Sequence, residues 1–465
     1  MIAGTVAIVF VMAAFACLFR MRRYRGWFRL PAQRTDGLSC RGNHRTYRLI
    51  VEPKGFDLAN GLNLQGRTVF LQITVKVLPL GRLFDPFIEI QEGQKTHRQY
   101  FERGVTGQRY LNLTPLFVRR SGEGPLLRVG LRGSSMRWDA EASLLVFDAP
   151  AIEGARVLVL APHPDDAEIA AFGMYGASRS WVATVTAGER GTGNLPSRFP
   201  THTRSRWAAL LRVADSLSVP QLGQVPPGRR VNLVYPDGAL ESMYQEPSRP
   251  FRLACEESLP RSQLRSENQI PEYRGGDSDC TWEKLVGEIR LLLELTQPDV
   301  VVCPHPLVDI HSDHVYTTVA LERAMRDLPG KLPLLLLYVV HNRGAPSYPF
   351  GPAESLVSLP PGKFDGWVAD SIYSHPLESG AQQAKYFAVE AMHAARSYAD
   401  GEPKSTLLIL KSIGQEIAAY IAGVSLDPAS FLRRAPRPNE IYYVVRGNML
   451  TALMEQSLDI RSASY

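Results

Sequence analysis

Apolar and polar positions follow two different rhythms along this chain, and the clearer one begins near residue 155. From there, short apolar runs alternate with longer stretches of helical period. The apolar runs, each typical of a buried strand, are 157–161, 181–186, 231–235, 300–303 and 334–340. The helix-like stretches between them are 168–180, 203–217, 282–295 and 315–326. This alternation predicts an α/β domain with a mostly parallel sheet, helices on both faces, and ligands beyond the carboxyl ends of the strands.

The preceding segment, 46–150, has no long helical period. It carries short β-branched or aromatic runs, separated by turns that contain Gly and Asp, at 47–51, 68–77, 87–90, 126–131 and 143–147. This pattern predicts a small β-sandwich. The sandwich is either a packing module with its aromatic residues in the core or a carbohydrate-binding module. In the second case the stacking platforms would be Tyr100, Phe101, Tyr110 and Trp138.

The N-terminal stretch 2–19 contains no charged side chain and is close to the lower limit of about 17–25 residues for a membrane-spanning helix. A cleaved signal peptide is the alternative, but it usually has basic residues before its apolar run, and this chain has none there. Six arginines follow the run instead: Arg20, Arg22, Arg23, Arg25, Arg29 and Arg34. The positive-inside bias therefore predicts a single-pass protein of the inner or plasma membrane, with its catalytic domain in the cytoplasm and its arginines on the headgroups.

Composition and charge narrow the classes of partner. The chain has 465 residues, of which 45% are hydrophobic and 21% charged, as is ordinary for a folded protein of two or three domains. The net charge is +6, and the clearest run of basic residues lies near the N-terminus. This position indicates a membrane partner and no nucleic-acid partner. The five cysteines form no C-x-x-C pair, which argues against a disulfide framework and against a cysteine zinc site.

These patterns together predict five parts of the chain. They are a transmembrane anchor at 1–20, a basic linker at 21–45, the β-sandwich module at 46–150, a Rossmann-like catalytic domain at 151–430 and a C-terminal extension at 431–465. Two segments of the catalytic domain, 241–279 and 343–374, are rich in Pro or Gly and are expected to be long loops. Two late helices are expected at 382–399 and 406–423.

The first group of chemically active residues follows the apolar run 157–161 directly. The sequence there is Ala-Pro-His-Pro-Asp-Asp-Ala-Glu, which places His163, Asp165 and Asp166 on a turn between a strand and a helix. Two adjacent carboxylates beside an imidazole repel one another unless a cation lies close to them. Histidine and aspartate together suit zinc. The alternative is a polar turn in which an aspartate caps the following helix.

The second group is His-Ser-Asp-His at 311–314, after the apolar run 300–303. His311 and His314 share one face at a helix start, and Asp313 is placed to hold one imidazole in a fixed tautomer. A surface helix with two histidines is the alternative. Both groups follow strands of the same predicted sheet, so His163, Asp166 and His314 form a set of three ligands that leaves one position open, as in catalytic zinc sites.

These two groups resemble the PIG-L/LmbE family of N-acetylglucosamine deacetylases. Weaker elements agree in order: the turns Thr-Ala-Gly-Glu-Arg-Gly at 186–191 and Tyr-Pro-Asp-Gly at 235–238, Arg206 at a helix start, and Lys385 followed by His393. The likeness covers about 155–396. Ala209 and Leu210 depart from it, because relatives commonly carry a glutamate there, and 170–173 lacks the family's glycine-rich run.

The resemblance implies roles for matching positions. His163, Asp166 and His314 would bind Zn²⁺ or another divalent metal, Asp165 would act as the general base, and His311, as an imidazolium, would stabilise the oxyanion or protonate the leaving amine. Asp313 is grouped with these catalytic residues. Weaker candidates for contact with the sugar are Glu189, Arg190, Arg206 and Asp237. For Glu189 and Arg190, an ion pair within the turn is the alternative.

The implied activity is zinc-dependent removal of the N-acetyl group from a GlcNAc-type N-acetylhexosamine. The expected anchor favours a lipid-linked or cell-surface glycan, such as a lipopolysaccharide precursor, as the substrate. Two alternatives remain open from the sequence. One is an amidase that acts on a soluble amino-sugar conjugate, and the other is a noncatalytic, membrane-anchored glycan-binding protein.

Overall fold

A computed structural model describes residues 34–396, except 43, 60, 83, 119–126, 277, 327, 343, 344, 346 and 363–367, and also 414, 417 and 430–462. The expected anchor at 1–20 and nearly all of the expected helix at 406–423 lie outside these residues. Within the described part, no helix combines the length and apolar character needed to cross a membrane.

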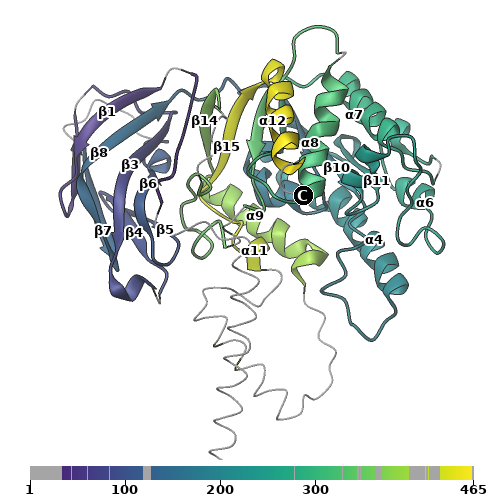
Figure 1. Ribbon diagram of the computed structural model, residues 1–465, viewed down its shortest axis with the longest axis horizontal. Coiled ribbons are helices and arrows are strands. Elements are labelled where there is room, and N and C mark those ends of the chain that lie inside the picture. The colour runs from purple at the N-terminus through teal and green to yellow at the C-terminus, as the bar shows by residue number, and fades with distance from the viewer. Residues whose placement is uncertain are drawn as a thin grey trace, which may run out of the picture.

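The structure has a β-sandwich beside a larger α/β unit (Figure 1). The sandwich consists of two four-stranded antiparallel sheets, ordered β1-β8-β3-β6 and β2-β7-β4-β5. The strands of the first sheet are β1 (Arg45–Ile50), β8 (Met136–Phe147), β3 (Thr68–Val77) and β6 (Thr106–Asn112). Those of the second are β2 (Gly55–Leu58), β7 (Leu127–Ser134), β4 (Phe87–Glu92) and β5 (Lys95–Tyr100), and two short 3₁₀ turns, η1 (Pro79–Arg82) and η2 (Thr114–Phe117), complete this unit.

Alternating side chains of both sheets fill the sandwich core. Val69, Leu71 and Ile73 of β3 pack with Ile88 and Ile90 of β4 in one buried cluster, as the period of two in a strand requires. Apolar burial of this kind is the main stabilising contribution of such a module.

Of the four aromatic residues expected as possible sugar-stacking platforms, two are buried in hydrophobic cores. Phe101 lies in the sandwich core, and Tyr110 is buried between the sandwich and the α/β unit. Tyr100 and Trp138 are half-buried. Phe101 and Tyr110 are therefore packing residues and do not form an exposed stacking surface.

The α/β unit is built on a seven-stranded sheet ordered β11-β10-β9-β12-β13-β15-β14. The strands are β9 (Arg156–Ala161), β10 (Arg179–Thr186), β11 (Arg230–Tyr235), β12 (Val300–Pro304), β13 (Leu334–Tyr338), β14 (Ser371–Pro376) and β15 (Asn439–Arg446). The pairs from β11 to β13 are parallel, and β15 pairs antiparallel with both β13 and β14. The architecture is thus a mixed α/β fold with a mostly parallel sheet and additional antiparallel sheets.

Helices cover both faces of this sheet, and the alternation within β9 shows why. Leu158 and Leu160 pack in a cluster with α7 (Trp282–Thr296), α8 (Ser312–Met325) and α12 (Leu450–Ser462). Val157 and Val159 point to the opposite face, toward α2 (Asp166–Ala170), α3 (Phe172–Gly176) and α9 (Ser379–Ala391). A strand buried on both sides reads as a continuous apolar run, which is the pattern seen at 157–161.

The remaining helices lie around the β11 edge and the late part of the chain. They are α4 (Thr201–Ser218), α5 (Leu240–Gln245), α6 (Arg261–Arg265) and α11 (Ser430–Arg433). The short 3₁₀ helices are η3 (Val219–Gly223), η4 (Pro227–Arg229), η5 (Pro271–Tyr273), η6 (His393–Ala395) and η7 (Gly447–Met449). The expected loop 241–279 is packed onto the sheet, because the buried Arg261 donates hydrogen bonds to the carbonyls of Leu233 and Val234 on β11.

Several expected elements differ from the structure. The expected loop 241–279 contains α6, η5 and most of α5. The helix expected at 168–180 is two short helices, α2 and α3, and β10 already begins at Arg179. The expected loop 343–374 contains the start of β14. Residues 431–465, which the sequence sets apart as an extension, supply β15, and this strand lies inside the sheet between β13 and β14.

The topology fixes where a site can form. The chain passes from β9 outward to β10 and β11, and then returns to place β12 on the other side of β9. The loops that follow β9 and β12 therefore diverge, and in open parallel sheets ligands bind at this kind of switch point.

Candidate metal centre

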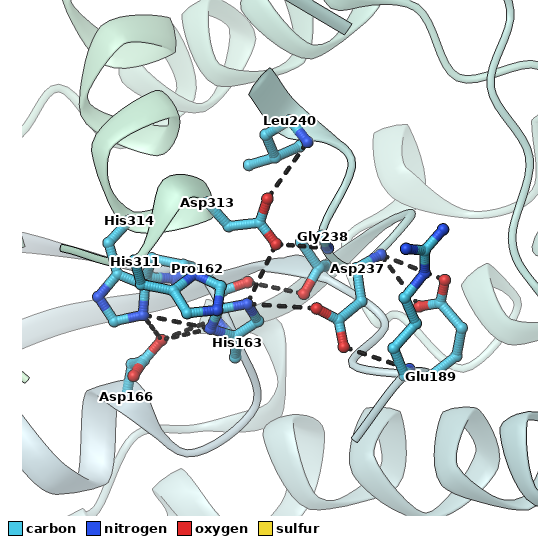
Figure 2. A network of polar contacts seen from close by, with 12 residues as sticks. Pro162, His163, Asp166, Glu189, Asp237, Gly238, Leu240, His311, Asp313 and His314 are labelled. Atoms are coloured by element: carbon cyan, nitrogen blue, oxygen red, sulfur yellow. Dashed lines mark hydrogen bonds and ion pairs between the residues drawn. The ribbon is translucent and has the colours of Figure 1, made fainter. Parts of the chain in front are cut away.

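Three side chains from two distant stretches meet beyond the carboxyl ends of β9 and β12 (Figure 2). Nδ1 of His163 lies 3.2 Å from Oδ2 of Asp166 and 3.2 Å from Nε2 of His314. Nε2 of His314 lies 3.1 Å from the same carboxylate oxygen. All three side chains are buried. The structure thus brings the three predicted ligands together as one triangle of donor atoms, here called the metal triad.

Local structure explains how the two stretches aim at one point. The strand β9 ends at Ala161, and the backbone N–H of His163 donates to Asp166 at 2.9 Å, which closes the turn before α2. His314 lies in the first turn of α8, which follows β12. Because β9 and β12 are adjacent parallel strands, both turns open at the same edge of the sheet.

Neighbouring carboxylates orient both imidazoles. Nε2 of His163, the nitrogen that faces away from the triad, lies 3.2 Å from Asp313 and 3.4 Å from Asp237. Nδ1 of His314 lies 3.0 Å from Asp309. A carboxylate on the outer nitrogen fixes the ring and its tautomer, as is typical around metal-binding histidines. Asp313 in turn accepts hydrogen bonds from the N–H groups of Gly238, at 2.6 Å, and Leu240, at 3.2 Å.

The donor set fits a divalent cation. Ligand atoms held about 2.0–2.2 Å from a tetrahedral zinc ion lie about 3.3 Å from one another, close to the separations in the triad. Burial opposes protonation of His163, but hydrogen bonds to Asp166, Asp237 and Asp313 raise its pKa well above the usual value. Burial likewise opposes protonation of His314, and Asp166 and Asp309 raise its pKa to about 10. This demand for positive charge is one that a metal ion would meet in place of the protons.

Further histidines surround the triad. Donor atoms of His163, His311 and His314 lie within 4.8 Å of one another, and so do those of Asp166, His314 and His341. His341 was not assigned a role from the sequence. Its position after the strand β13 is the signal that could have singled it out, because β13 is the next strand beside β12.

Asp165, the predicted general base, lies at the start of α2 and is buried. Burial raises the pKa of its carboxyl group to about 6, and the Arg212 guanidinium acts in the opposite direction. Nη2 of Arg212 lies 3.3 Å from Oδ2 of Asp165. Arg212 was not predicted from the sequence, where it reads as an ordinary arginine within a helix.

His311 occupies the N-cap position of α8, and its ring centroid lies 4.6 Å from that of His163. Its Nδ1 is buried without a hydrogen-bond partner among the described residues. Burial, together with the neighbouring imidazoles, lowers the pKa of His311 to about 4. This environment favours a neutral imidazole, in place of the imidazolium that the resemblance implies.

The weaker candidates for substrate contact differ in their surroundings. Glu189 is fully buried, and its carboxylate accepts hydrogen bonds from the N–H groups of Asp237 and Ala254, so it supports a turn. Asp237 is half-buried beside His163, and the exposed Arg190 donates its N–H to it at 3.2 Å. Arg206 stacks on the exposed Trp207, and the structure gives it no contact with the triad.

Comparison with known proteins agrees with this geometry. Residues 158–325 match the model of the PIG-L family, described as GlcNAc-PI de-N-acetylase, and this range contains the whole metal triad. No curated protein matches the chain. The segment that holds the triad is therefore similar to the PIG-L family, and this similarity supports an amide-hydrolysing enzyme.

Solved structures with some likeness are more distant. A40926 pseudoaglycone deacetylase Dbv21 is 19% identical, with 63% of this chain and 98% of that protein covered and a TM-score of 0.32. The zinc-inhibited form of teicoplanin deacetylase Orf2 is 18% identical over 63% and 98%, with a TM-score of 0.31. The 4-carboxy-2-hydroxymuconate hydratase GalB from Pseudomonas putida KT2440 is 11% identical over 57% and 84%, with a TM-score of 0.29.

Proposed function

We propose that this protein is a metal-dependent N-deacetylase that hydrolyses the acetamido group of a GlcNAc-type N-acetylhexosamine. The observation that carries the proposal is the metal triad of His163, Asp166 and His314, with the carboxylate of Asp165 beside it. The PIG-L match to the segment that contains all four residues supports the same reaction.

The donor set suits zinc, although other divalent metals accept two imidazoles and one carboxylate. A cation bound there would polarise the amide carbonyl and bring the pKa of a coordinated water toward about 7. The protein residues would supply the proton transfers. Such general acid–base catalysis contributes typically about 10²–10⁴-fold to the rate.

Asp165 would accept a proton from the attacking water. The water oxygen bonds to the acetyl carbon, the C–N bond breaks, and the proton passes to the nitrogen, so that acetate and a free amino sugar leave. His311 would donate an N–H hydrogen bond to the carbonyl oxygen as negative charge develops on it. Asp237, half-buried beside Nε2 of His163, and the exposed Arg190, whose backbone N–H it accepts, would bind sugar hydroxyls.

The substrate we propose is a glycan attached to a lipid or to the cell surface, such as a lipopolysaccharide precursor, reached by a protein tethered through residues 2–19. The apolar run and the arginines after it support this arrangement. Tethering raises the effective concentration of the enzyme near a membrane-bound substrate. Carbonate extraction of membranes, with the full-length protein compared with a version that lacks residues 1–33, tests it. Equal release of both into the soluble fraction would contradict it.

Acetate release is the direct test of the activity. The full-length protein, loaded with Zn²⁺, is incubated with N-acetylglucosaminyl lipids, nucleotide sugars and soluble amino-sugar conjugates, and acetate is measured. We expect metal-dependent release from a lipid-linked acceptor. Release from soluble conjugates alone would favour the amidase alternative. Glycan binding without any release would favour a noncatalytic role.

A further inference from the structure

We infer that Arg212 is the residue that positions the general base, and this inference rests on the proposed deacetylase function. Arg212 lies on α4, which belongs neither to the β9 turn nor to the β12 turn. Its guanidinium group nevertheless reaches the β9 turn. Nη2 lies 3.3 Å from Oδ2 of Asp165 and 3.4 Å from the carbonyl oxygen of Pro164. Arg212 therefore holds both the carboxylate and the backbone beside it.

The contact is enclosed. The side chain of Arg212 is 13% exposed and that of Asp165 is 8% exposed. An ion pair shielded from water in this way is stronger and less mobile than a surface pair. Asp165 also lies next to the carboxylate of Asp166, so removal of the guanidinium would leave two buried carboxylates in adjacent positions with one fewer cation.

The Gly-Glu-Arg-Gly turn at 188–191 leaves room for this arginine. A Cβ atom at Gly188 would lie 2.4 Å from Nε of Arg212, and one at Gly191 would lie 2.7 Å from Nη1. Gly188 also has a φ of 67°, which favours glycine. Because Gly188 and Gly191 carry no side chain, the guanidinium group of Arg212 can pass this turn and reach Asp165.

Only one oxygen of the Asp165 carboxylate, Oδ2, takes part in the ion pair with Arg212. The structure gives Oδ1 of Asp165 no hydrogen-bond partner among the described residues, whereas Oδ2 is held by Arg212. A carboxylate fixed through one oxygen presents the second in a defined direction, which is what a base needs in order to meet a water molecule. Arg212 acts through Asp165, so it is a positioning residue.

The test is a double-mutant cycle with R212M and D165N in the full-length, zinc-loaded protein. We expect R212M to lower kcat about 10–100-fold, the scale of a misplaced catalytic group, with KM changed less than about threefold. In the D165N background, R212M should change kcat by less than about twofold, because the base is already absent. R212K should recover part of the lost kcat, since it keeps the charge. R204M, on the same helix, is the matched control and should behave as the wild type.

Full additivity of R212M and D165N would overturn the inference, and so would a rise in KM with kcat unchanged, which would indicate substrate contact. Zinc affinity and a crystal structure of R212M provide readouts without turnover. We expect the metal triad unmoved, zinc affinity within about threefold of wild type, and the Asp165 carboxylate displaced. An undisplaced Asp165 would refute positioning even if no substrate is turned over, whereas inactivity of the wild type on every substrate would refute the proposed function alone. If R212M does not fold, the same comparison is made with R212K and R212Q.

Discussion

Nδ1 of His314 lies 3.0 Å from Oδ2 of Asp309, and the same carboxylate also accepts backbone hydrogen bonds. Oδ2 also accepts the N–H groups of Val340 and His341, and Oδ1 accepts that of His311. Asp309 therefore connects the loop after β12, the start of α8 and the end of β13. Fixed by these three segments, it sets the direction in which Nε2 of His314 points.

Substitution D309N should weaken zinc binding. The amide can no longer offer two anionic oxygens to the imidazole and the backbone, and loss of such a supporting carboxylate typically costs about 10–100-fold in metal affinity. Competition with a chromophoric chelator measures the affinity. D299N, at a surface pair with Arg156, is the control and should remain within about twofold of wild type. A folded D309N protein with unchanged affinity would show that His314 needs no such support.

Substitutions of the adjacent residues Asp165 and Asp166 should have different effects on zinc binding and activity. D165N removes the proposed base and should lower kcat about 10²–10⁴-fold while zinc stays bound. D166N removes a ligand of the triad and should lower bound zinc as well as activity. Metal content by atomic absorption and acetate release are measured on the same preparations. Equal loss of zinc in both variants would mean that Asp165 is itself a ligand.

Glu189 should make stability depend on pH. Burial raises the pKa of its carboxyl group from 4.5 to about 7, so the folded protein holds this proton more tightly than the unfolded chain does. The stabilisation is complete below pH 4.5 and is lost as the pH rises through about 7. The difference corresponds to about 3 kcal/mol at most.

The variant E189Q cannot ionise, yet it keeps an oxygen for the N–H groups of Asp237 and Ala254. Its free energy of unfolding relative to wild type should therefore rise between pH 4.5 and pH 8. Urea unfolding at several pH values measures this difference. E294Q, an exposed helix position, should give a difference independent of pH. The same flat profile for E189Q would contradict the raised pKa.

The sequence predicts the parts of this fold that depend on local period. The run 157–161 matches β9 (Arg156–Ala161), and 282–295 matches α7 (Trp282–Thr296), because burial on one or two faces leaves a regular apolar pattern. The strand β15 (Asn439–Arg446) was not predicted, since it follows the parallel series by a long interval and enters the sheet between β13 and β14. The run Ile-Tyr-Tyr-Val-Val at 441–445 is itself typical of a strand, but its position between β13 and β14 depends on long-range pairing, which leaves no local signal.

The same distinction holds within the site. His163, Asp166 and His314 could be proposed as ligands because each follows a recognisable strand in a short polar motif. Asp309 and Arg212 could not, since their roles depend on where a loop and a helix pack in three dimensions. Glu189 is the opposite case. A charged residue in a conspicuous turn suggested substrate contact, whereas the structure buries it beneath that turn.

A buried ion pair joins the late part of the chain to the helices behind the site. Nζ of Lys385 on α9 lies 2.8 Å from Oε1 of Glu440 on β15, and the two side chains are 1% and 3% exposed. Glu440 also accepts the N–H groups of Gly173 and Met174 at the start of α3. One carboxylate thus connects α9, β15 and α3.

K385M should destabilise the fold by about 3–5 kcal/mol, because it leaves Glu440 buried without its cation. K385M/E440Q should cost less than the sum of the single changes, since the amide needs no counter-charge. Urea denaturation measures the free energy of unfolding of K385M, E440Q and K385M/E440Q. R290M, which breaks an exposed pair within α7, should cost less than about 0.5 kcal/mol. A similarly small cost for K385M would mean that Glu440 is held mainly by the N–H groups of α3 and that the lysine contributes little.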